Sequence, residues 1–209
     1  MNGALCFTET RAIVLLSVFS KWYSSCLAQL LERHVRSIDG PKHCQLYGFM
    51  PGRRTHEVTS GLNNIVRHAA MWGKSYSLSW ASLDVARAFD NFTIPCAAEA
   101  MRFSNVDPYF AYAVLEGYTN NMATHRFQEI DTSNIPWDSC IRTGSMEAPM
   151  LWVLVSIMIS EPVCTGWFER GLGYPLGTVG APNDWNITNM LWADNVLLFA
   201  ASDDQATRL

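Results

Sequence analysis

Trp192-Ala193-Asp194-Asn195 stands inside an otherwise apolar stretch and runs directly into Val196-Leu197-Leu198-Phe199-Ala200. Far upstream, Asp84 ends a second strand-like segment. Carboxylates are rare in apolar segments unless something pairs with them. Two carboxylates brought together by separate strands provide oxygen ligands for divalent cations, the minimum requirement for two-metal nucleotidyl transfer. Taken alone, a strand-end aspartate and a tight Ala-Asp-Asn turn would explain the same residues.

Five stretches follow one another in an order that matches a set of known motifs: Arg11 to Ser17, Tyr47 to Thr55, Asp84 to Phe89, Ile141 to Leu151 and Trp192 to Asn195. The third has an aspartate followed five residues later by an aromatic, as in motif A. The fourth is similar to Arg-Gln-Gly-x-x-x-x-Pro-Leu of motif B, and the fifth to aromatic-Ala-Asp-Asp of motif C. The second contains Gly-Phe-x-Pro-Gly-Arg. Together they resemble the reverse transcriptases of non-LTR (LINE-type) retroelements.

The resemblance implies an α+β fold with two regions, fingers within residues 1–75 and a palm within 76–209. The palm would be an antiparallel sheet backed by helices, and the chain would end before motif D and the thumb. Residue periodicity by itself predicts the class α+β without its topology. It predicts these elements: helices over 9–36, 55–72, 95–102, 109–119 and 146–163, the last ended by Glu161-Pro162; a strand over 76–85; and hairpins pairing 125–130 with 139–143 and within 186–200.

The resemblance assigns metal binding to Asp84 and Asp194, with the backbone carbonyl of Val85 as a further oxygen ligand. The ions would be Mg²⁺, or Mn²⁺ in its place. Asn195 stands where most relatives have a second catalytic aspartate. Asparagine keeps a carbonyl oxygen but lacks the negative charge, so two close dications would be less well neutralised.

Other residues are assigned to the nucleotide and the template. Phe89 falls where the family places an aromatic against the sugar 2′ position, although a core phenylalanine is an equal alternative. Gly144 would let the backbone approach the templating base pair. Arg142 and Arg53 would contact template phosphates, and Arg11 the incoming triphosphate. For each of these cations an exposed side chain without a specific role is the alternative.

Bulk properties agree with an intracellular nucleic-acid enzyme. The net charge of −4 divides into +5 over residues 1–80 and −9 over residues 81–209. This division suits an N-terminal part that contacts phosphates and a C-terminal part that binds metal ions. No apolar stretch is long enough to predict a membrane span. The six cysteines are scattered without a C-x-x-C pair, so we expect neither disulfides nor a zinc site. A reducing compartment, cytoplasm or nucleus, fits this pattern.

The sequence therefore predicts an RNA-directed DNA polymerase that extends a DNA or RNA primer on an RNA template with deoxynucleoside triphosphates. One alternative is a catalytically inactive retroelement remnant, or a nucleic-acid-binding pseudo-polymerase. Asn195 favours that alternative, as do Thr143 and Glu147, which depart from motif B. Another alternative is an RNA-dependent RNA polymerase. Phe89 argues against it, because those enzymes prefer a small or polar residue against the sugar.

Overall fold

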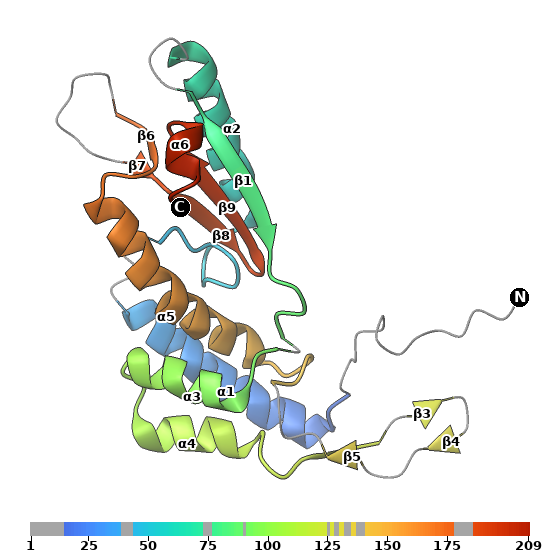
Figure 1. Ribbon diagram of the computed structural model, residues 1–209. Helices are drawn as coiled ribbons and strands as arrows, with labels where there is room; N and C mark the ends of the chain where they lie inside the picture. The colour runs from blue at the N-terminus through green and yellow to red at the C-terminus, as the bar shows by residue number, and fades with distance from the viewer. Residues whose placement is uncertain are drawn as a thin grey trace, which may run out of the picture.

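The computed structural model describes residues 15–38, 44–72, 77–89, 91–124, 126–127, 130–131, 135–136, 141–177 and 186–209. Figure 1 shows helices and a small sheet in one continuous arrangement, which confirms the predicted class α+β. The helices are α1 (Val18–Ser37), α2 (Thr55–Trp72), α3 (Ile94–Phe103), α4 (Pro108–Glu116), α5 (Ala148–Glu169) and α6 (Asp203–Ala206).

An antiparallel sheet holds the two acidic segments. Its strands are β1 (Ser79–Asp84), β8 (Asn189–Trp192) and β9 (Asn195–Ala200), in the order β1-β9-β8. The β8–β9 hairpin confirms the prediction for residues 186–200, and β1 lies within the predicted strand 76–85. Among the described residues there are also three short antiparallel pairs: β2 (Met122–Ala123) with β5 (Ile135–Pro136), β3 (Arg126–Phe127) with β4 (Ile130–Asp131), and β6 (Tyr174–Pro175) with β7 (Asn186–Ile187).

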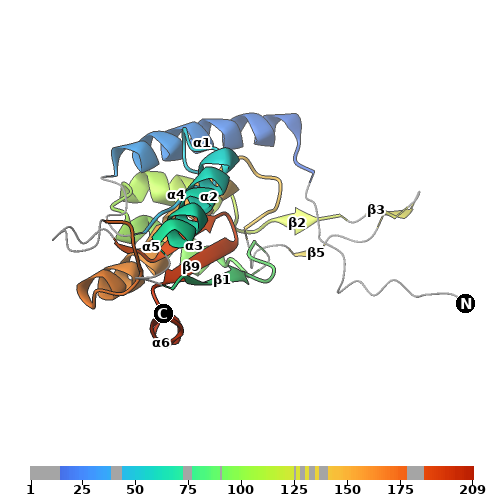
Figure 2. The ribbon, with the colours of Figure 1, turned by 90° about the horizontal axis from the view of Figure 1, so that it is seen from above.

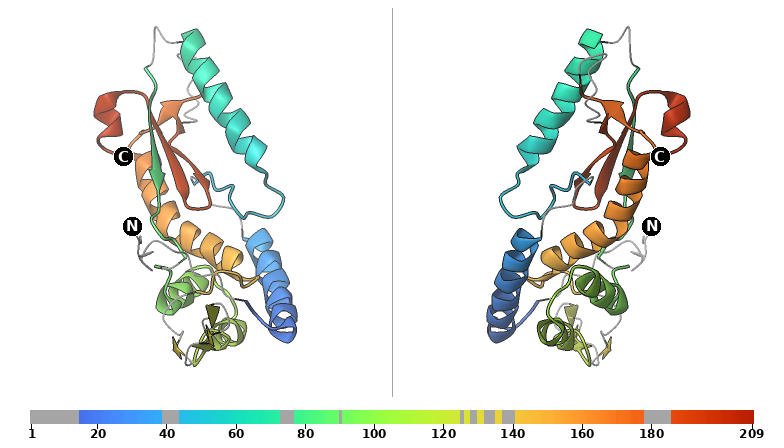
Figure 3. Two further views of the ribbon diagram at one scale, coloured as in Figure 1. Left: turned by 90° about the vertical axis from the view of Figure 1, so that its right-hand side faces the viewer. Right: turned by 90° about the vertical axis from the view of Figure 1, so that its left-hand side faces the viewer.

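Each face of the sheet packs against a different helix, as the side views in Figure 3 show. Alternate residues of a strand point to opposite faces. Leu197 and Phe199 of β9 join the apolar cluster that includes Ile65 of α2. Val196 and Leu198 join the larger cluster around α5. Both faces of β9 are therefore covered by apolar clusters, which accounts for the uninterrupted apolar run after Asp194.

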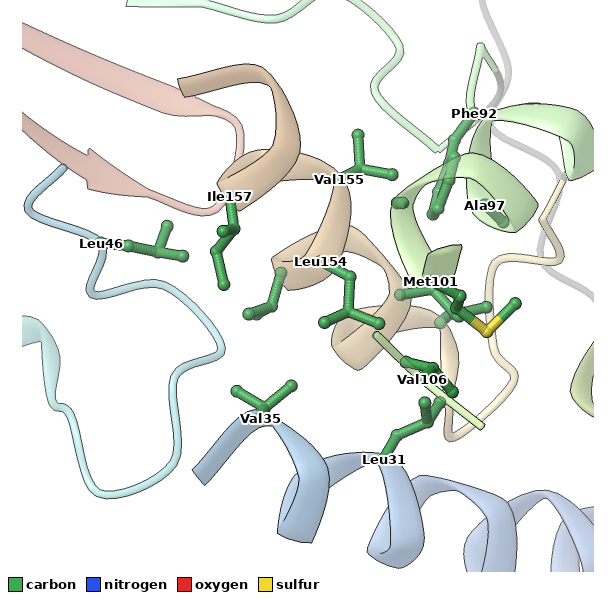
Figure 4. Packing of buried hydrophobic residues seen from close by; sticks show 14 of the residues in the cluster. Leu31, Val35, Leu46, Phe92, Ala97, Met101, Val106, Leu154, Val155 and Ile157 are labelled. Atoms are coloured by element: carbon green, nitrogen blue, oxygen red, sulfur yellow. The ribbon is translucent and has the colours of Figure 1, made fainter. Parts of the chain in front are cut away.

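Helix α5 lies at the centre of the larger cluster. Figure 4 shows Leu154 of α5 between Leu31 and Val35 of α1 and Met101 of α3. Seen from above, α1 runs along one side of the molecule and α2 crosses over the sheet (Figure 2). By length and composition α5 could cross a membrane, but nine of its residues are buried, all except Ser156 within this cluster. Core packing therefore accounts for the apolar residues on its buried face, whereas Ile159, Val163 and Phe168 are exposed.

Two local predictions are wrong. Helix α5 does not end at Glu161-Pro162 but continues to Glu169, with Pro162 inside it. Burial of Cys164 and Trp167 beyond the proline offsets the hydrogen bond that the missing N–H removes. The predicted hairpin between residues 125–130 and 139–143 is replaced by the pairs β2–β5 and β3–β4. Ile141 instead donates its N–H to the carbonyl of Phe92, 2.9 Å away.

The other helices follow their sequence signals. Helix α2 has the predicted bounds. Helix α1 begins at Val18, where the Ser17 side chain accepts a hydrogen bond from the Ser20 N–H as an N-cap. Asp107 caps α4 in the same way, with Pro108 in its first turn. Residues 9–14 of the predicted first helix lie outside the described residues.

Candidate active site at the end of the sheet

Asp84 and Asp194 lie beside each other at one end of the three-stranded sheet. Asp84 is paired with Asn195 across β1 and β9, and directly opposed residues in an antiparallel pair have Cβ atoms roughly 4.5–5.5 Å apart. Just beyond that pair, the Val85 N–H donates to the Asp194 carbonyl at 2.9 Å. Asp84 is exposed and Asp194 is partly exposed. The ladder thus holds the two backbones next to each other while leaving their carboxylates accessible to solvent.

The turn that carries Asp194 has an unusual backbone. Ala193 adopts a left-handed conformation with φ of 54°, which costs a non-glycine residue about 1–2 kcal/mol. The Trp152 indole N–H on α5 donates to the Ala193 carbonyl at 2.9 Å. Strained backbone of this kind persists where the surroundings hold it in place, and it is common at functional sites. Trp152 is one of the groups that hold it.

Residues 44–54, which we call the strap, hold the turn from the other side. The strap runs beside β8, where the Leu191 N–H donates to the Gln45 carbonyl and the Tyr47 N–H donates to the Leu191 carbonyl, both at 2.8 Å. A Cβ added to Gly48 would overlap the backbone nitrogen of Ala193. Position 48 therefore requires glycine for close approach, and the Gly-Phe-x-Pro-Gly-Arg stretch is brought against the Asp194 turn.

Phe89 lies in an aromatic group beside the same turn. Its ring is 6.3 Å from that of Phe49 in the strap and 5.7 Å from that of Trp152. Phe49 also has a left-handed backbone, with φ of 58°. Trp152 thus contacts Phe89 through its ring and the Asp194 turn through its indole N–H. The packing fits the alternative of a core phenylalanine, and the role of Phe89 against a sugar stays a prediction.

The residues around Asp84 fit a metal ion with few protein ligands. Among the residues that the structure describes, no group of three or more His, Cys, Asp or Glu side chains could hold a metal ion. Asp84 and Asp194 offer hard carboxylate oxygens, Asn195 faces Asp84 in the ladder, and Val85 follows Asp84 directly. Mg²⁺ is often held by one or two carboxylates together with substrate phosphates and water. This donor set suits that pattern, and metal binding stays a prediction.

The predicted cationic residues are placed differently from one another. Arg53 forms an ion pair with Glu57 at 3.0 Å and lies 5.3 Å over the Tyr47 ring. Its hydrogen bond lowers the pKa of the Glu57 carboxyl below the ordinary 4.5. Arg142 donates to the Gly117 carbonyl at 2.7 Å, so its guanidinium is engaged within the protein. Arg11 lies outside the described residues.

Gly144 is the exposed tip of the loop formed by residues 141–147. Its φ of 108° is a conformation that side chains rarely adopt, so glycine is required by the backbone itself. The following Glu147, counted as a departure from motif B, is 2% exposed and hydrogen-bonded to Tyr118. Sequence reasoning missed the positions of Gly48, Trp152 and Glu147 because each acts through residues distant along the chain.

The four described free cysteines are Cys26, Cys44, Cys96 and Cys164. Cys44 and Cys164 are buried in the core cluster, and Asn189 links their neighbourhood by bonding the Gln45 N–H and the Cys164 sulfur. The hydrogen bond with the Cys164 thiol, followed by burial, raises the pKa of Cys44, so this thiol is poorly suited to nucleophilic chemistry. Cys6 and Cys140 lie outside the described residues.

No protein-family model and no curated protein matches this chain. Among solved structures, apo telomerase from Candida tropicalis, truncated from its C-terminal domain, is similar with a TM-score of 0.46 and 10% sequence identity. The similarity covers 90% of this chain and 36% of that chain. At this TM-score and identity the likeness establishes no activity for this chain.

Proposed function

We propose that this chain is the fingers and palm core of a reverse transcriptase, an RNA-directed DNA polymerase that adds deoxynucleotides to a primer 3′-hydroxyl. The observation that carries the proposal is the juxtaposition of Asp84 and Asp194. Two segments far apart in sequence deliver accessible carboxylates to one end of an antiparallel sheet. Like charges held side by side repel each other, and a divalent cation carrying a nucleotide would relieve that repulsion.

In the proposed reaction Asp84 and Asp194 would hold the metal ions, and the Val85 carbonyl would be a further ligand. Bound Mg²⁺, or Mn²⁺, would activate the 3′-hydroxyl and neutralise charge on the departing pyrophosphate. The strap and Trp152 hold the backbone of the Asp194 turn, so this turn would be in position before substrate arrives. The Phe89 ring and the Gly144 loop would border the nucleotide and the template strand.

A second candidate function is nucleic-acid binding without catalysis, as in an inactive retroelement remnant. The observation that favours it is Asn195, which lies directly opposite Asp84 where a third carboxylate would strengthen metal binding. Asparagine provides an oxygen without charge, so the affinity for two dications would fall. The side chain at position 195 is therefore the one to change in order to discriminate between the two candidates.

Primer extension on an RNA template with deoxynucleotides and Mg²⁺ or Mn²⁺ tests both. We expect extension by the native chain, loss of extension in Asp84→Asn, and faster extension in Asn195→Asp. Asp204→Asn is a matched control, because it neutralises an exposed carboxylate at the opposite end of β9. Extension by Asn195→Asp alone would favour the inactive remnant. Extension that survives Asp84→Asn, or that no variant shows, would contradict the polymerase proposal.

A further inference from the structure

A group of buried polar side chains lies at the start of α5, apart from the Asp84–Asp194 pair. We call it the polar cluster and define it as Ser24, Tyr118, Arg142, Ser145 and Glu147. Four of its members are almost inaccessible: Ser24 is 4% exposed, Tyr118 1%, Ser145 4% and Glu147 2%. A buried carboxylate destabilises a protein strongly unless it is hydrogen-bonded. Its presence here therefore calls for partners and for a reason.

The partners come from three separate elements. The Tyr118 hydroxyl, in the turn after α4, donates to Glu147 Oε1 at 2.6 Å. The Ser24 hydroxyl on α1 donates to Glu147 Oε2 and accepts from the Met146 N–H at 2.9 Å. The Ser145 hydroxyl lies 2.7 Å from the Tyr118 oxygen. Glu147 thus connects α1, the turn after α4 and the loop 141–147 through one carboxylate.

The charge environment keeps these bonds in place. Glu147 directly precedes the first residue of α5, where the helix N-terminus favours a carboxylate. The Arg142 guanidinium lies 4.8 Å over the Tyr118 ring and donates to the Asn121 side chain at 3.1 Å. Burial, followed by the charge of Glu147 and the hydrogen bond to it, raises the pKa of Tyr118 well above 10. The phenol therefore remains a donor at neutral pH.

Two connections lead from the polar cluster to the candidate active site. Within the loop, the Ile141 N–H is bonded to Phe92 and residues 145–147 are held by the polar cluster, which leaves Gly144 at a tip fixed on both sides. Along α5, Trp152 follows Glu147 by five residues and bonds the Ala193 carbonyl beside Asp194. The placement of Glu147 therefore bears on both the Gly144 tip and the Asp194 turn.

We propose that Glu147 is a positioning residue, which sets the Gly144 loop and the start of α5 relative to the Asp194 turn. It touches no reacting group and acts through the loop and through Trp152. Its link to nucleotide use rests on the proposed function, whereas its effect on the loop does not. Glu147 departs from motif B, and it would compensate for that departure by fixing the loop through its own hydrogen bonds.

Hydrogen exchange of backbone amides tests the structural part without any catalysis. In Glu147→Gln and in Ser24→Ala we expect amides of residues 141–147 to exchange about tenfold faster. The first variant weakens the hydroxyl-to-carboxylate bonds that anchor the loop, and the second removes the acceptor of the Met146 N–H. Faster exchange should extend to residues 191–195, while amides of α2 stay unchanged. Glu169→Gln, an exposed glutamate at the far end of α5, is the matched control and should change nothing. Unchanged exchange in the loop, or an equal rise throughout the chain, would overturn the proposal.

Steady-state kinetics of primer extension tests the link to the substrate. In Glu147→Gln we expect KM for the deoxynucleotide to rise about tenfold with a much smaller change in kcat, because the proposed metal-binding carboxylates of Asp84 and Asp194 are unchanged. A fall in kcat alone, or no change in either constant, would overturn the assignment. Should the native chain not extend primers, the proposed function fails, and hydrogen exchange alone decides the role of Glu147.

Discussion

Asp84 and Asp194 present accessible carboxylates on a tightly held backbone, whereas Glu147 presents a carboxylate whose side chain is itself enclosed by donors. At the sheet end the contacts from Gly48 and Trp152 reach main-chain atoms of Ala193. In the polar cluster the contacts from Ser24 and Tyr118 reach the carboxylate oxygens. A carboxylate left accessible on a rigid backbone suits an external cation, whereas one satisfied within the protein serves to join elements.

Replacing Gly48 is expected to break this arrangement most severely. Gly48→Ala places a methyl group against the Ala193 nitrogen, so the strap or the turn must move. We expect the free energy of unfolding to fall by about 3 kcal/mol, the upper range for overpacking. Urea denaturation followed by circular dichroism measures the change.

The matched control for Gly48→Ala is Gly166→Ala in α5, where an added Cβ would meet no atom within 4 Å. We expect it to raise the free energy of unfolding by about 0.5–1 kcal/mol, through the better helix propensity of alanine. If Gly48→Ala is as stable as the native chain, the close approach of the strap to the turn is not present in solution.

Trp152→Phe should have an intermediate effect, since it removes one donor and keeps most of the ring. The Ala193 carbonyl loses the bond that helps to hold its left-handed residue, and we expect a loss of about 2 kcal/mol. Trp167→Phe, at a buried tryptophan near the far end of α5, controls for lost packing. We expect both variants to lower stability and Trp152→Phe alone to reduce primer extension. Equal activities would show that Trp152 supports the core without positioning the turn.

The parts of this molecule that sequence predicts well are those set by neighbours along the chain. Helix α2 has a 3.6-residue periodicity, and the β8–β9 hairpin has an Ala-Asp-Asn turn followed by an apolar run; each appears where predicted. That the Asp84 and Asp194 segments belong to one antiparallel sheet was implied, by contrast, only by a family resemblance, because hydrophobic pattern specifies faces and not partners. The convergence of Asp84 and Asp194 belongs to this second kind.

The unpredicted features all depend on residues far apart in sequence. Glu147 meets Ser24 across 123 positions, so nothing near Glu147 indicates that its charge would be buried and hydrogen-bonded. Helix α5 passes through Pro162 because Trp167 is buried beyond it, and local breaker signals do not include that contribution. Gly48 entered the sequence analysis only as part of the Gly-Phe-x-Pro-Gly-Arg stretch, whereas its lack of a side chain allows the close approach to Ala193. Tertiary packing overrides local preference at each of these positions.

The smallest expected effect tests the enclosed carboxylate through the pH dependence of stability. In the folded state the pKa of Tyr118 is raised, so the phenol keeps its proton above pH 10, whereas in the unfolded chain it is released near 10. The stabilisation from Tyr118 is thus fully present below pH 10 and is lost as the pH rises further. By linkage the loss reaches about 0.8 kcal/mol at pH 10.5.

Tyr118→Phe has no phenol to titrate at position 118, so its stability cannot show this loss above pH 10. At pH 8 the variant should be less stable than the native chain by about 1 kcal/mol, because Glu147 Oε1 has lost its donor. By pH 10.5 we expect most of that difference to vanish, as measured by urea midpoints at the two pH values. Tyr109→Phe, at a tyrosine that is 88% exposed, controls for loss of a phenol as such. If the stability difference between Tyr118→Phe and the native chain stays constant between pH 8 and 10.5, Tyr118 is not enclosed with Glu147. The contrast between an enclosed carboxylate at Glu147 and an accessible one at Asp84 would then be wrong.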